Sequence, residues 1–188
     1  MQATKLFETW AKRFVTLSMI NAILALIWLL FPLFYDTRIS RTIAGGSVGT
    51  WGYLGFLGFI IVGCLGTATF GGLYYLVPKL TNGSINNLLS WLHMVLMEAG
   101  TLVTTGLLGT AGYIGGTTIL DETARCNTLS GTAKTDCLGG VSRLVHERIT
   151  PYVTEPIPYV AVFAGIAGVG VLLGVVNLFM ALRGPKKV

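Results

Sequence analysis

Glu98 is a carboxylate inside a long apolar stretch, where acidic residues are rare. It follows Leu88, at the start of that stretch, by ten residues, so a helix would carry it about 15 Å into the hydrocarbon layer. A charge there costs at least about 2.5 kcal/mol and marks a functional site by default, although a protonated Glu98 would avoid much of this cost. Glu98 could relay protons, hydrogen-bond a quinone or pair with a partner subunit. The structural alternative is a neutral glutamic acid bonded to another helix.

His93 is the histidine of the same apolar stretch and lies near its start, beside Trp91. Five helical steps separate it from Glu98, which corresponds to a rotation of about 140° around the helix axis. The two side chains therefore do not share a face and make a poor acid–base pair. We expect His93 to be an interfacial or packing residue rather than a ligand. His146 lies in a polar segment and is expected to be a solvated surface residue.

No motif of an enzyme active site accompanies these residues. The sequence has no P-loop, dinucleotide-binding glycine pattern, zinc-ligand cluster or nucleophile motif. We therefore expect no catalytic, cofactor-binding or metal-binding residue in this chain. Cys64 lies within another apolar stretch and is predicted to be a small packing residue.

The composition indicates a membrane protein. Hydrophobic residues make up 53% of the 188 residues and charged residues 11%, whereas roughly 25% of the residues in soluble domains are charged. A helix needs about 20 apolar residues to cross a hydrocarbon core of roughly 30 Å. Such stretches cover residues 14–34, 51–77, 88–116 and 157–182. We predict an all-α, integral membrane four-helix protein that forms a single domain over residues 1–188.

Basic residues gather on one side of the predicted membrane. With four spans, both ends of the chain share a side with the connector that follows residues 51–77. This side carries one acid, Glu8, against these basic residues: Lys5, Lys12, Arg13, Lys79, Arg183, Lys186 and Lys187. The positive-inside rule then predicts a protein of the cell membrane with both termini in the cytoplasm. Basic residues at helix ends, without interleaved aromatics, do not indicate nucleic-acid binding.

The connector over residues 117–156 should be an outward-facing loop, and it contains Cys126 and Cys137. Disulfides persist in oxidising compartments, and closing a loop of this size stabilises a fold by about 3 kcal/mol in the chain-entropy model. We predict a disulfide between these cysteines. Two free thiols are the alternative, while a metal site would need further ligands at suitable spacing.

Glycines are frequent in the predicted spans, and Gly170 and Gly174 have the spacing of a small-residue helix interface. Helix association in lipid depends on close backbone approach at such residues. We therefore expect tight packing within the chain or against another membrane protein. Thr101, Thr104 and Thr105 are expected to bond within the bundle rather than to line a channel.

Residues 71–116 contain an ordered series of glycines, aromatics, one proline and one histidine. The series comprises Gly71, Gly72, Tyr74, Tyr75, Pro78, Trp91, His93 and the glycine-rich run 109–116. It resembles part of the catalytic subunit of haem-copper terminal oxidases. In that family a helix ends in a Gly-Gly, aromatic, Pro pattern, and the next helix opens with Trp and a nearby His and closes on a glycine-rich exit.

The resemblance has one departure with chemical consequences. In the family, the helix that leads to the proline carries two haem-ligating histidines about twenty residues earlier, spaced two apart. Phe56 and Gly58 stand at those places here. The resemblance thus implies that the four helices parallel the last four of the catalytic subunit without its cofactors. It implies that this chain alone binds none, with haem and copper in partner subunits.

The function implied by the resemblance is that of a non-catalytic membrane subunit of an archaeal or bacterial respiratory oxidase or oxidase supercomplex. It would pack against cofactor-bearing subunits, stabilise the assembly and shape a quinone or lipid site near Glu98. The alternative is a small transporter or proton-conducting protein in which Glu98 titrates. Inverted repeats or broken helices would support that alternative, and the sequence contains no convincing repeat. A free-standing b-type cytochrome would need two chains to supply two ligands through His93.

Overall fold

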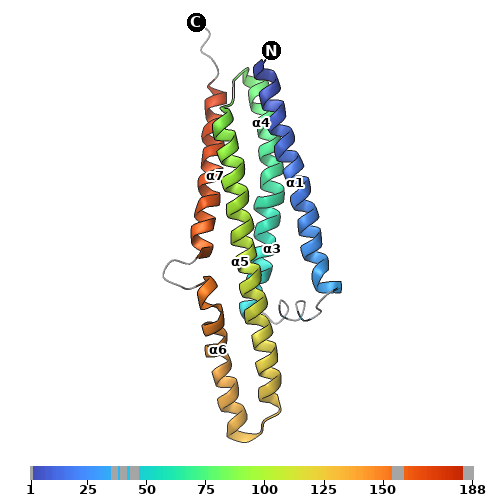
Figure 1. The fold of residues 1–188 in the computed structure, drawn as a ribbon, viewed down its shortest axis with the longest axis vertical. Coiled ribbons are helices and arrows are strands. Elements are labelled where there is room, and N and C mark those ends of the chain that lie inside the picture. Colours follow the sequence, from blue (N-terminus) through green and yellow to red (C-terminus); the bar gives the residue numbers. More distant parts are fainter. Residues whose placement is uncertain (1, 35–37, 39–41, 43–46, 154–158, 184–188) are drawn as a thin grey trace. The chain divides into compact units, whose positions relative to one another are not determined.

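The computed structural model describes residues 2–34, 38, 42, 47–153 and 159–183. These residues are helical almost throughout and include no strand, which confirms the predicted all-α class. In chain order (Figure 1) the elements are α1 (Gln2–Phe34), η1 (Ser47–Gly49), α3 (Thr50–Gly58), the π-helical segment η2 (Phe59–Gly66), α4 (Thr67–Thr81), α5 (Asn87–Asn127), α6 (Gly131–Val153) and α7 (Tyr159–Leu182).

Four helical segments are long and apolar enough to cross a membrane, which confirms a multi-pass membrane protein. They are Leu6–Phe31, Thr50–Thr81, Asn87–Asn127 and Tyr159–Leu182. Each segment overlaps one predicted span, but the first three start earlier or end later than predicted, because backbone hydrogen bonding continues into the polar flanks. Residues 157 and 158 of the fourth predicted span lie outside the described residues, as do Lys186 and Lys187.

The connector over residues 117–156, expected as a loop, is largely helical, so that its predicted secondary structure is wrong. α5 continues to Asn127 and α6 occupies most of the remainder, while residues 154–156 lie outside the described residues. The 41 residues of α5 span about 61 Å, twice the thickness of the hydrocarbon core. The hydroxyls of Thr117 and Thr118 each donate to a carbonyl of the preceding helical turn, at 2.8 Å, and so bond within α5.

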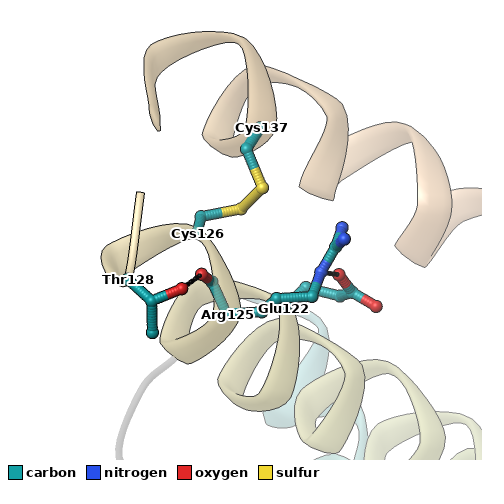
Figure 2. Close-up of a disulfide and its surroundings, with 5 residues drawn as sticks. All are labelled: Glu122, Arg125, Cys126, Thr128 and Cys137. Carbon is teal, nitrogen blue, oxygen red and sulfur yellow. Dashed lines mark hydrogen bonds and ion pairs between the residues drawn. A yellow bond between two sulfur atoms is a disulfide. The ribbon is translucent and has the colours of Figure 1, made fainter. Parts of the chain in front are cut away.

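A disulfide joins Cys126 of α5 to Cys137 of α6, with the two Cα atoms 5.5 Å apart (Figure 2). This confirms the predicted pairing. At the end of α5, the Thr128 hydroxyl donates to the Arg125 carbonyl and the Arg125 side chain pairs with Glu122, each at 2.8 Å. The disulfide therefore links two helices rather than the ends of an irregular loop.

Removing this disulfide should destabilise the α5–α6 pair. We expect the Cys126→Ser/Cys137→Ser chain to lose about 3 kcal/mol of unfolding free energy, since the unfolded chain regains the freedom of a closed loop. Thermal unfolding in mild detergent, with and without reductant, measures the effect. A Cys64→Ser chain is the control and should keep the response to reductant. An unchanged melting temperature of the reduced wild type would contradict the prediction.

The described chain divides into two compact units. Unit 1 comprises Met1–Ala25, Gly58–Val103 and Phe163–Val188, and unit 2 comprises Leu26–Leu57 and Thr104–Val162. In unit 1, parts of α1, α4, α5 and α7 lie side by side (Figure 1). Their core contains Trp10, Phe14, Tyr74, Met97 and Leu178, all buried.

Unit 2 depends on close backbone contact between α3 and the second part of α5. A Cβ atom added at Gly112 would lie 2.2 Å from the backbone nitrogen of Gly52, and one added at Gly55 would lie 2.8 Å from the Thr105 carbonyl oxygen. Only glycine fits such an approach, as expected for helix packing in lipid. On α3, Phe56 packs edge-on against Trp28, with ring centroids 6.0 Å apart.

Candidate functional site

Glu98 of α5 is tied to α1 and to η2 through the side chain of Asn21. Asn21 Nδ2 donates to Glu98 Oε2 at 3.0 Å and to the Gly63 carbonyl oxygen at 2.7 Å. Asn21 is 1% exposed, whereas Glu98 is half-buried. One amide group therefore joins three elements of unit 1, and its two protons are both donated. Asn21 Oδ1 is buried and has no hydrogen-bond partner among the described residues.

The π-helical segment η2 supplies backbone acceptors to this site. In a π-helix the backbone bonds run from residue i to i+5, a rare pattern that often marks functional sites. The Gly63 carbonyl accepts from Asn21 and from the Thr67 hydroxyl, and the Cys64 carbonyl accepts from the Ser18 hydroxyl at 2.8 Å. A Cβ atom at Gly63 would lie 3.5 Å from Asn21 Nδ2 and 3.0 Å from the Phe59 ring. Glycine at this position thus leaves room for the Phe59 ring of the same segment.

A groove of about 770 Å³ runs between α1 and α5, and Glu98 is one of the residues that line it. Its volume lies within the range of about 300–1,000 Å³ that is usual for small-molecule sites. Lys12 and Arg13 of α1 line one end, while Ile20 and Leu102 lie further along. The groove thus joins a basic end, a mostly apolar wall and one carboxyl group.

His93 lies in the core of unit 1 and not at an interface with solvent. It is 0% exposed, and its ring centroid is 4.2 Å from that of Phe70 and 4.9 Å from that of Phe14. A Cβ atom at Gly174 of α7 would lie 2.4 Å from His93 Nδ1, so the imidazole rests directly on the backbone of α7. This placement fits the expected packing role.

Asn177 of α7 is the centre of a buried polar network beside His93. Its Oδ1 accepts from the Asn86 backbone N–H at 2.7 Å. Its Nδ2 shares two protons among three acceptors: Ser90 Oγ at 2.9 Å, the Asn86 carbonyl at 3.0 Å and Tyr74 Oη at 3.2 Å. The network links α4, α5 and α7. Sequence reasoning missed it, although a single amide inside an apolar span was a signal that could have found Asn177.

The network also reaches His93. Tyr74 Oη, which lies 3.2 Å from Asn177 Nδ2, is hydrogen-bonded to His93 Nδ1 at 3.2 Å. His93 Nε2 is buried and has no hydrogen-bond partner in the described part of the chain. The Phe70 ring packs edge-on against the imidazole. His93 and Glu98 therefore have separate partners, on different faces of α5.

The glycines singled out from the sequence pack α7 against α5. A Cβ atom at Gly170 would lie 2.4 Å from the Met97 backbone nitrogen, and Gly174 contacts His93. A second set of small residues on α7, namely Ala164, Gly165 and Gly168, is exposed, and a Cβ atom at either glycine would meet nothing within 4 Å. α7 thus has one small-residue face in use within unit 1 and another that is open.

The remaining sequence candidates lie apart from this site. Cys64 is a buried free cysteine of η2, as its predicted packing role requires. His146 is exposed on α6. Within the described ranges, no three His, Cys, Asp or Glu residues are grouped so that they could hold a metal ion.

Comparison of the chain with protein-family models, with curated proteins and with solved structures gives no match. The resemblance of residues 71–116 to haem-copper oxidases stays a prediction.

Proposed function

We propose that this chain is a non-catalytic membrane subunit of a respiratory terminal oxidase of the haem-copper type, or of an oxidase supercomplex, in the cell membrane with both termini in the cytoplasm. The open small-residue face of α7 carries this proposal. Ala164 and Gly168 are exposed and four residues apart, the spacing at which helices in lipid approach each other closely. Because Gly170 and Gly174 already pack against α5, the open face is available to a helix of another subunit.

The choice of an oxidase rests on the resemblance and on how its residues are arranged. Tyr74 and His93, two members of the resembling series, share a hydrogen bond at 3.2 Å. At the haem-ligand places, Phe56 packs against Trp28 and Gly58 ends α3. Neither residue offers a ligand atom. The residues present therefore do not fit a haem, and the haem and copper would belong to partner subunits.

The groove beside Glu98 supports the second part of the proposal, a quinone or lipid site. Glu98 is half-buried, is held by Asn21 and lines the groove. A carboxyl group that lines a groove contacts the molecule that occupies it. Its role in the subunit would be to shape that site rather than to perform chemistry of its own.

Isolation of the chain from its native membranes in mild detergent tests the proposal. We expect a tagged chain to carry along subunits with a Soret absorption band. Gly168→Leu should reduce this co-purification by about tenfold, as removal of a central interface contact does. Gly72→Leu, at another exposed glycine whose Cβ atom would meet nothing within 4 Å, is the control. A chain that migrates alone, without any haem-containing subunit, would contradict the proposal.

A proton-conducting protein is the second candidate, because Glu98 lines a groove whose other end is basic. In this case, liposomes that contain the purified chain should conduct protons, and Glu98→Gln should abolish the flux. Equal flux through the wild type and Glu98→Gln would remove this candidate without affecting the subunit proposal.

A further inference from the structure

We propose that the groove between α1 and α5 binds one anionic phospholipid, whose phosphate contacts Lys12 and Arg13 and one of whose acyl chains lies along the groove. This names the occupant of the quinone or lipid site proposed above and rests on that part of the proposed function only. The groove is lined entirely by residues of unit 1, so the inference applies to the chain with or without its partners.

The basic end of the groove provides the charge that a phosphate requires. Lys12 and Arg13 are adjacent, exposed and part of the lining. The Arg13 guanidinium lies over the Trp10 ring, 4.5 Å from its centroid, and Trp10 Nε1 donates to Asn87 Oδ1 at 2.9 Å. The ring is thereby fixed between α1 and α5, and it holds the guanidinium at the groove. The planar guanidinium can then donate two parallel hydrogen bonds to phosphate oxygens.

The length of the groove matches one leaflet of a bilayer. Its α1 lining runs from Thr9 to Ile20, which corresponds to about 16 Å along a helix. Half of a hydrocarbon core of roughly 30 Å is about the same length. A molecule with its charged group at Lys12 would reach Ile20 about 12 Å further along α1, most of the way to the bilayer midplane. This is the shape of a lipid rather than of a water-soluble ligand.

The wall of the groove is suited to an acyl chain. Leu17 and Ile20 of α1 face Val95 and Leu102 of α5 across it. Basic residues at helix ends commonly extend toward lipid headgroups. Here an open, mostly apolar groove continues directly from the two cations, so a lipid whose headgroup binds there can lay its acyl chain along α1 and α5.

The charges favour a phospholipid over a quinone. A neutral quinone would leave Lys12 and Arg13 unused, and Glu98 Oε2 is already bonded to Asn21. Asn21 lies nine residues beyond Lys12, about 13 Å along α1, so Glu98 is far from the phosphate. Glu98 therefore should not determine affinity for the lipid headgroup.

Lipid binding to the purified chain, measured by native mass spectrometry, tests the inference. The probes are phosphatidylglycerol and phosphatidylcholine with identical acyl chains. We expect one retained phosphatidylglycerol per chain and weaker retention of phosphatidylcholine. The Lys12→Gln/Arg13→Gln chain should bind phosphatidylglycerol about 30-fold more weakly, since each of the two basic residues contributes a factor of about five to the affinity for an anionic headgroup.

Three further variants make the test specific. Lys79→Gln/Arg183→Gln removes two exposed basic residues outside the groove and should keep phosphatidylglycerol binding. Ala99→Trp fills the groove without a change of charge and should weaken the binding of both lipids. Glu98→Gln should affect the retention of the two lipids equally, because Glu98 lines the groove far from the phosphate.

Several results would overturn the inference. They are equal retention of the two lipids, equal losses in the two double variants, or a long-chain quinone whose binding depends on Glu98 and not on Lys12 and Arg13. None of these results bears on whether the chain co-purifies with haem-containing subunits, so failure here and failure of the proposed subunit role are distinguishable.

Discussion

Replacing Gly170 with valine should force α7 away from α5 and lower the unfolding free energy of the chain by about 3 kcal/mol. A Cβ atom at this position would lie 2.4 Å from the Met97 backbone nitrogen and 3.0 Å from the Met97 Cα. Both are backbone atoms of α5, so no side-chain rotation can relieve the overlap and the helix itself must move. Thermal unfolding in mild detergent, followed by circular dichroism, measures the loss.

Gly168→Val is the matched control for this prediction. Gly168 lies two residues away on α7, where an added Cβ atom would meet nothing within 4 Å. Its stability in the isolated chain should stay within about 0.5 kcal/mol of the wild type, as for other exposed substitutions. Equal effects of the two valines would show that α7 does not pack against α5 through Gly170.

Asn177→Leu should lower the unfolding free energy by about 2–4 kcal/mol. Leucine has a similar size but accepts nothing from the Asn86 N–H and donates nothing to Ser90 or Tyr74. These groups are then left in an apolar interior with fewer partners. Their desolvation, rather than a lost volume, causes the destabilisation. The same unfolding experiment measures it.

A double-mutant cycle with Tyr74→Phe identifies the network as the cause. Because Asn177 Nδ2 donates to Tyr74 Oη at 3.2 Å, the two substitutions should be non-additive by at least about 0.5 kcal/mol. Val176→Leu, at the exposed neighbouring position, should be close to neutral. An Asn177→Leu chain as stable as the wild type, or strictly additive effects in the cycle, would contradict the role of the network.

The spans and the disulfide were predictable because each follows from a local property of the sequence. Apolar length alone decides whether a helix can cross lipid, and two cysteines with ten residues between them have few other uses in a segment predicted to face outward. The helical form of residues 117–127 was not predictable in this way. Thr117 and Thr118 favour loops by composition, yet their hydroxyls bond within α5. Whether these residues are helical therefore depends on the helix that precedes them.

The site was predictable in part. Glu98 was identified because a lone acid in an apolar span is costly, but its partner Asn21 is 77 residues away. That pairing depends on the rotation and offset of α1 against α5, which no local pattern encodes. The π-helical segment that offers the Gly63 carbonyl departs from the usual helical period, so periodicity could not reveal it. Asn21 and Asn177 were the available signals, as single amides within apolar spans.

The hydrogen bonds of Asn21 set an order in which the nascent chain can mature. During synthesis from the N-terminus, Asn21 emerges 42 residues before Gly63 and 77 residues before Glu98. α1 therefore enters the membrane with an amide that has neither of these partners, and Gly63 becomes available to it before Glu98 does. Asn177 is different, because all of its partners precede it. α7 is thus the last helix to join unit 1. A chain stalled on the ribosome before α7 is synthesised would be an intermediate in which Tyr74 and Ser90 lack their hydrogen bonds to Asn177.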